Sequence, residues 1–85
     1  MRAFEILVND KRTCLAGVDG EGVLTAIVSW TPKDLPTDRV EIGALESLTR
    51  RHLDWGTFGL KVGDEVKIRI VDVQHADPPI SFKDQ

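Results

Sequence analysis

The chain has 85 residues, of which 41% are hydrophobic and 29% charged, and its formal net charge is −3 at pH 7. These fractions are typical of a folded protein, and a chain this short can bury only one core, so we expect a single domain over residues 1–85. The acidic balance argues against nucleic-acid binding, which normally requires a basic face.

The sequence also argues against a membrane-spanning segment and an internal disulfide bond. No run approaches the ~20 apolar residues needed to cross a bilayer, and the N-terminal residues lack the long apolar core of a secretory signal. Cys14 is the only cysteine, so it has no partner for an internal disulfide or a cysteine-based zinc site. We therefore expect a cytoplasmic protein without a metal or other cofactor.

Alternating apolar and polar residues predict strands in the first third of the chain. The expected strands cover residues 3–8, 13–18 and 23–30. Asn9-Asp10 is typical of a turn, and Asp19-Gly20-Glu21-Gly22 is typical of a hairpin, so the three strands are predicted to form an antiparallel meander. Because residues 23–30 are apolar on both faces, we expect this strand to be central in its sheet.

The middle of the chain is harder to assign. Prolines 32 and 36 break the pattern and predict an exposed connection over residues 31–38. A fourth strand is expected over residues 39–45. For residues 46–53, the spacing of Leu45, Leu48 and Leu53 leaves one or two helical turns open as an alternative to an irregular connection reaching residue 60.

The C-terminal third contains the clearest predicted strand, over residues 65–73, introduced by Gly63-Asp64. Residues 60–66 resemble the turn that begins a long strand in many small β-barrels and OB-like domains. Pro78-Pro79 excludes a helix, and residues 80–83 suit an edge strand. The sequence therefore predicts a mainly all-β fold. We expect one small antiparallel sheet of five or six strands, curled into a partly open barrel or sandwich, with a short helical turn near 46–53 as an option.

Enzymatic activity is not predicted. The glycine-rich residues 17–22 are followed by a strand instead of the helix that a phosphate loop needs, and their acidic side chains would repel phosphate. Cys14 lies within a strand at an inward position, where cysteine usually behaves as a small hydrophobic residue. The serines lack the surroundings of a catalytic nucleophile.

Two repeated pairs, His52-x-Asp54 and His75-x-Asp77, provide an alternative based on metal binding. On an extended segment, residues two apart point to the same side, so each pair could supply two ligands. The other interpretation is that both histidines are exposed or hydrogen-bonded to nearby carboxylates.

Residues 50–58 are the predicted binding segment, because they combine aromatic and basic side chains in an unusually long connection. The candidate binding residues are Arg50, Arg51, His52, Asp54, Trp55 and Phe58. In one interpretation the aromatic residues close an end of the core; in another the basic residues face an acidic partner.

The predicted function is a small non-enzymatic module that binds another protein, as a regulator, an inhibitor or immunity-type factor, or a complex subunit. The alternative of a different class is an OB-like domain for single-stranded nucleic acid, with Trp55 and Phe58 as stacking platforms.

Overall fold

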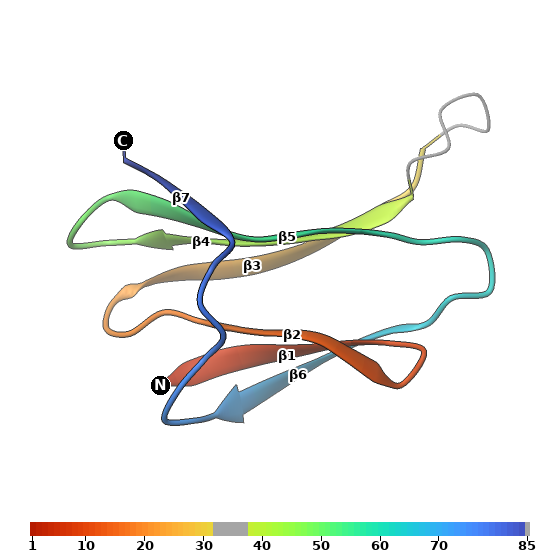
Figure 1. The fold of residues 1–85 in the computed structure, drawn as a ribbon, viewed down its shortest axis with the longest axis horizontal. Helices are drawn as coiled ribbons and strands as arrows, with labels where there is room; N and C mark the ends of the chain where they lie inside the picture. The colour runs from red at the N-terminus through yellow and green to blue at the C-terminus, as the bar shows by residue number, and fades with distance from the viewer. Residues whose placement is uncertain (32–37, 85) are drawn as a thin grey trace.

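The chain forms two antiparallel sheets packed as a sandwich (Figure 1). This computed structural model describes residues 1–31 and 38–84. The strands are β1 (Arg2–Val8), β2 (Lys11–Gly17), β3 (Gly22–Ser29), β4 (Arg39–Glu46), β5 (Arg51–Gly59), β6 (Val66–Asp72) and β7 (Ser81–Asp84). One sheet has the order β2-β1-β6 and the other β3-β4-β5-β7, and they do not close into a barrel.

The all-β prediction is confirmed, with seven strands in two sheets where five or six strands in one curled sheet were expected. The described residues include no helix, and residues 47–49 form a turn, so the helical turn considered near 46–53 was wrong. Of the connection expected over 31–38, residues 32–37 lie outside the described part. No helix in the described ranges could cross a membrane.

The predicted meander and the central position of the third strand were wrong. β1 pairs with β2, but β3 pairs with β4 in the other sheet, so the turn before β3 crosses between sheets instead of closing a hairpin. Within the described residues β3 has no second neighbour and forms an edge of its sheet. The pattern of apolar residues shows that both faces of a strand are apolar, but it does not show what covers them.

β5 corrects the interpretation of residues 50–58 as a loop. A register shift next to Ile42 leaves Trp55 as an extra residue, which is a β-bulge. Gly56 adopts a φ of 116°, and its N–H donates to Asp54 Oδ1 at 2.8 Å. This bulge interrupts the period-two alternation, which is why the sequence pattern hides the strand.

The turns at one end of the β1–β6 ladder confirm the turn chemistry expected there. Asn9 and Asp10 have φ angles of 52° and 65°, and Gly63 has 97°. Asn9 Nδ2 donates to Asp64 Oδ1 at 3.0 Å, and the Lys61 N–H donates to Asp64 Oδ2 at 2.9 Å. These hydrogen bonds favour the carboxylate and lower the pKa of Asp64, so any stability they contribute is lost as the pH falls through that lowered pKa.

The core lies between the inner faces of the two sheets. Its buried residues are Ile6, Cys14 and Ala16 from the first sheet and Val40, Ile42, Ala44 and Trp55 from the second. The strand pairing places Ile6 opposite Cys14 and Ile42 beside Ala26. Period-two alternation therefore does define the inner face, as the sequence predicted.

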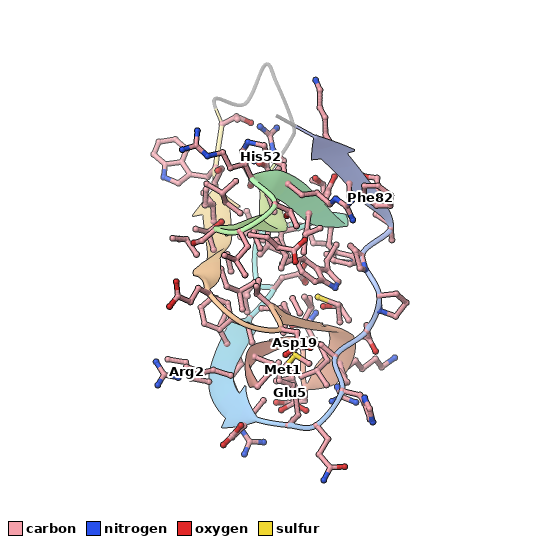
Figure 2. All side chains as sticks on the ribbon, turned by 90° about the vertical axis from the view of Figure 1, so that its left-hand side faces the viewer. Met1, Arg2, Glu5, Asp19, His52 and Phe82 are labelled. Carbon is pink, nitrogen blue, oxygen red and sulfur yellow. The ribbon has the colours of Figure 1, made fainter. Side chains whose placement is uncertain are left out.

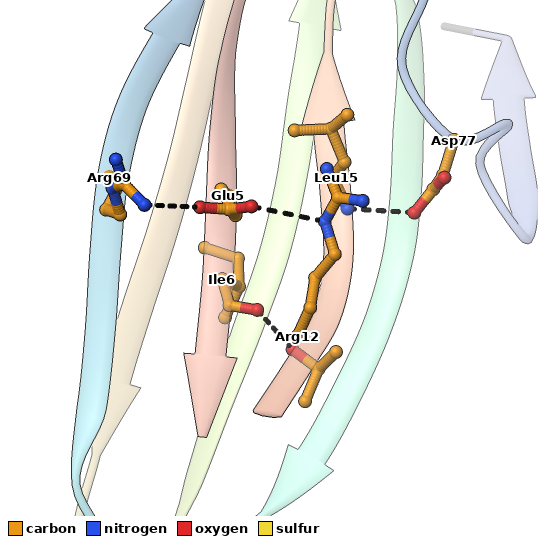
Figure 3. Close-up of polar contacts among 7 residues, drawn as sticks. Glu5, Ile6, Arg12, Leu15, Arg69 and Asp77 are labelled. Carbon is orange, nitrogen blue, oxygen red and sulfur yellow. Dashed lines mark hydrogen bonds and ion pairs between the residues drawn. The ribbon is translucent and has the colours of Figure 1, made fainter. Parts of the chain in front are cut away.

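Residues 73–80, which we call the strap, cross from β6 to β7 and close one side of the sandwich (Figure 1). Within the strap, Asp77 contacts both sheets. Its N–H donates to Leu15 O at 2.8 Å, and its Oδ2 accepts from the Leu15 N–H at 2.8 Å (Figure 3). Its carbonyl oxygen accepts from Trp55 Nε1 at 2.8 Å. Asp77 thus links β2 to the buried tryptophan of β5.

We expect Asp77→Ala to lower the free energy of unfolding by about 1–3 kcal/mol, because it leaves the half-buried Leu15 N–H without its charged acceptor. Urea unfolding followed by tryptophan fluorescence measures the change. The control is Asp72→Ala, which removes a 92% exposed carboxylate paired with the Met1 amine and should change stability by less than about 1 kcal/mol. Equal losses in the two variants would contradict the role assigned to Asp77.

Candidate functional site

Of the two aromatic residues in the predicted binding segment, Trp55 belongs to the core and Phe58 packs against the core. Trp55 is 4% exposed, and its indole N–H is occupied by the Asp77 carbonyl. Phe58 is half-buried and packs against the same cluster. Both rings contribute to packing between the sheets, and the buried Trp55 ring is not available as a platform on the surface.

The four polar residues of that segment are divided between different surroundings. Arg50 is exposed in the turn before β5, with a φ of 54°. The Arg51 guanidinium lies 4.5 Å from the centre of the Phe82 ring, a cation–π contact. His52 is exposed on β5, and the Asp54 carboxylate accepts the Gly56 N–H. Because side chains alternate along a strand, the six predicted residues do not form one patch.

The His-x-Asp pairs are not gathered into a metal-binding group. Among residues 1–31 and 38–84, no three or more His, Cys, Asp or Glu side chains are grouped so that they could hold a metal ion. Asp54 and Asp77 each accept a hydrogen bond from a backbone N–H. We therefore assign both aspartates a structural role and carry the metal alternative no further.

Cys14 is buried, as the sequence predicted. Burial raises the pKa of its thiol above the usual value, and the negative charge of Asp77 raises the pKa further. The native chain therefore keeps this proton at a pH where the unfolded chain loses it. The contribution of the protonated Cys14 thiol to folding stability is therefore complete below the pKa of the thiol in the unfolded chain. It is lost as the pH rises through the pKa of the thiol in the folded chain.

We expect the Cys14 thiol of the native protein to react with a disulfide reagent at pH 8 at least about tenfold more slowly than in urea-unfolded chain, because the thiolate is the reactive form. Asp77→Asn should speed the native reaction, since it removes the charge but keeps an oxygen that can accept the Leu15 N–H. Absorbance of the released thiol measures both rates. Equal rates for native and unfolded chain would contradict the assignment.

The side of the sandwich opposite the strap is where sequence reasoning missed a candidate surface. We call it the open side; it is bounded by the edges of β3 and β6. In the described part of the chain, β3 pairs only with β4, and β6 only with β1. Figure 2 shows these two strands on the left and the strap on the right, with Arg2 pointing outward on the left.

Two cavities with apolar and charged lining residues lie along the open side. One of about 550 Å³ lies beside β3 and β6 and includes Phe4, Val18, Leu24 and Ile70 in its lining, with Arg2 and Asp19 as its charged residues. The other, of about 410 Å³, is lined by residues that include Val28, Trp30, Val62 and Val66.

Large apolar side chains are exposed around these cavities. Trp30 is 82% exposed, Ile70 is 69% exposed and Val28 is 54% exposed. On the outer face of β3, Val23 and Ile27 are 60% and 54% exposed. Clusters of exposed large apolar side chains mark interaction sites in many proteins. The signal in the sequence was the strand with two apolar faces, which we assigned to the centre of a sheet.

Comparisons of the chain with protein families, curated proteins and solved structures found no match. The candidate site is therefore defined by the geometry of the open side alone.

Proposed function

We propose that the chain is a non-enzymatic protein-binding module that docks its partner on the open side. The observation that carries the proposal is β3, an edge strand with exposed apolar side chains on both faces. A free strand edge offers unpaired N–H and C=O groups, and neighbouring apolar side chains add the hydrophobic contribution. Together they favour a partner that extends the sheet.

The exposed aromatic residue on this side supports the same proposal. Trp30 lies next to the second cavity, and tryptophan is enriched among the residues that contribute most to binding. The role we propose is that of a complex subunit, regulator or inhibitor, with the docking surface moved from residues 50–58 to the open side. We keep the cytoplasm as the proposed compartment, since Cys14 is a single free thiol.

The nucleic-acid alternative receives less support. Base stacking needs exposed ring faces, whereas Trp55 is buried in the core and Phe58 is half-buried against it. The net charge of −3 also opposes binding to a phosphate backbone. No particular contact favours this function over protein binding.

A pair of matched positions tests the proposal by photo-crosslinking. A photoreactive phenylalanine analogue replaces Ile70 on the open side or Ile80 on the strap, which are similarly exposed at 69% and 72%. Each variant is expressed in cells of the source organism and irradiated. We expect a discrete protein adduct from position 70 and none from position 80, because only the first position lies on the proposed docking surface.

The adduct's mass identifies its composition, including whether it contains a second copy of the chain. The same photoreactive substitution at Ile27 tests the open side again, in case the analogue at position 70 is poorly oriented for crosslinking. Absence of an adduct from both open-side positions, or the same adduct from position 80, would overturn the proposed function.

A further inference from the structure

We propose that the partner on the open side is a second copy of this chain, paired through β3 of both copies in antiparallel orientation. This inference rests on the proposed function, since it assigns an occupant to the same surface. It makes the domain a symmetric dimer in which two four-stranded sheets become one continuous sheet.

The chemistry of β3 defines what its neighbour must be. Leu24, Ala26 and Val28 share the inner face, as their pairing with core residues of β4 shows. Val23 and Ile27 share the outer face and are exposed. A strand that lies beside β3 therefore has apolar neighbours on both of its faces. On its paired side, β3 already has a charged outer-face neighbour, because Glu41 of β4 lies opposite Ile27. On its free side, an uncharged strand would keep Val23 and Ile27 away from further charged groups.

β3 itself has the composition required of this neighbour. Its residues Gly22–Ser29 are GVLTAIVS and include no charged side chain. In an antiparallel pair, directly opposed residues lie on the same face. A two-fold axis at Thr25 therefore opposes Leu24 to Ala26 on the inner face and Val23 to Ile27 on the outer face, with no like charges opposed within the strands.

The other free edge of the open side differs in charge. β6 carries Lys67 and Arg69 on its outer face, where they contact Asp10 and Glu5 at 3.2 and 3.4 Å (Figure 3 shows the second contact). Lysine and arginine on an edge oppose strand addition, and symmetric pairing of β6 would bring like charges together. The difference in charge therefore assigns the pairing to β3 instead of β6.

The position of β6 also fits a dimer about β3. Ile68 and Ile70 of β6 are exposed, and Ile70 lines the same cavity as Leu24 of β3. Pairing of two β3 strands brings these isoleucines toward the second copy. The cavity that Ile70 shares with Leu24 of β3 would then face the interface. Apolar area from both sheets thus contributes to the same contact.

Sedimentation equilibrium over a range of protein concentrations tests the inference. We expect wild type to approach twice the chain mass of 9.5 kDa. Ile27→Lys, at an exposed outer-face position of β3, should raise the dimer dissociation constant by about tenfold or more, because it places two like charges on one face of the paired strands. Thr25→Lys is a second variant on the same exposed face. Ile80→Lys on the strap is the matched control and should leave the constant unchanged.

The outcomes separate this inference from the proposed function. Dimeric wild type and Ile80→Lys, together with weakened association in the folded β3 variants, would support it. A wild type that stays monomeric at every concentration, or β3 variants that associate as strongly as wild type, would overturn it. An adduct to a different protein from position 70, combined with monomeric wild type, would leave the proposed function in place. Absence of any adduct from positions 70 and 27 would remove both.

Discussion

The three hydrogen bonds of Asp77 are the interactions on which the shape of this sandwich depends. The strap has no strand pairing of its own between β6 and β7, so its contact with the sheets relies on such individual bonds. Asp77 satisfies the backbone of Leu15 at the edge of β2 and the indole N–H of Trp55 in the core. Buried or half-buried polar groups left without partners would each oppose folding, so this residue closes one side of the sandwich and fixes the position of the core tryptophan.

Closure on the strap side has a consequence for the opposite side. The C-terminal segment covers β2 and β5 and adds β7 to the second sheet. In the described residues, nothing equivalent pairs with β3 or with the outer edge of β6. The two edges differ in chemistry: β6 carries charged side chains that pair within the chain, whereas β3 carries none. This difference supports the proposed binding role, because the charged side chains of β6 oppose strand addition at its edge, whereas the uncharged β3 edge is suited to pairing.

Local sequence patterns predicted much of the fold. Period-two alternation identified β1, β2, β4 and β6 within a few residues, and Asn9-Asp10 and Gly63-Asp64 marked the turns where positive φ angles occur. β5 was missed because the bulge at Trp55 and Gly56 interrupts that alternation. The Asp77–Leu15 contact joins residues 62 positions apart, and no local pattern carries such information. The docking surface that we propose differs from residues 50–58 for a related reason. Aromatic and basic residues close together in the sequence point to different faces of one strand, whereas the open side is assembled from β3 and β6.

Backbone hydrogen exchange of β3 reports on the proposed dimer at the strand edge where the two copies would pair. Alternate N–H groups of β3 point away from β4 and pair with no other strand among residues 1–31 and 38–84. The account predicts that these amides exchange rapidly in dilute protein and become protected as the concentration rises, while the amides bonded to β4 stay protected throughout. Exchange of the outward-pointing β3 amides that remains rapid at every concentration would contradict it.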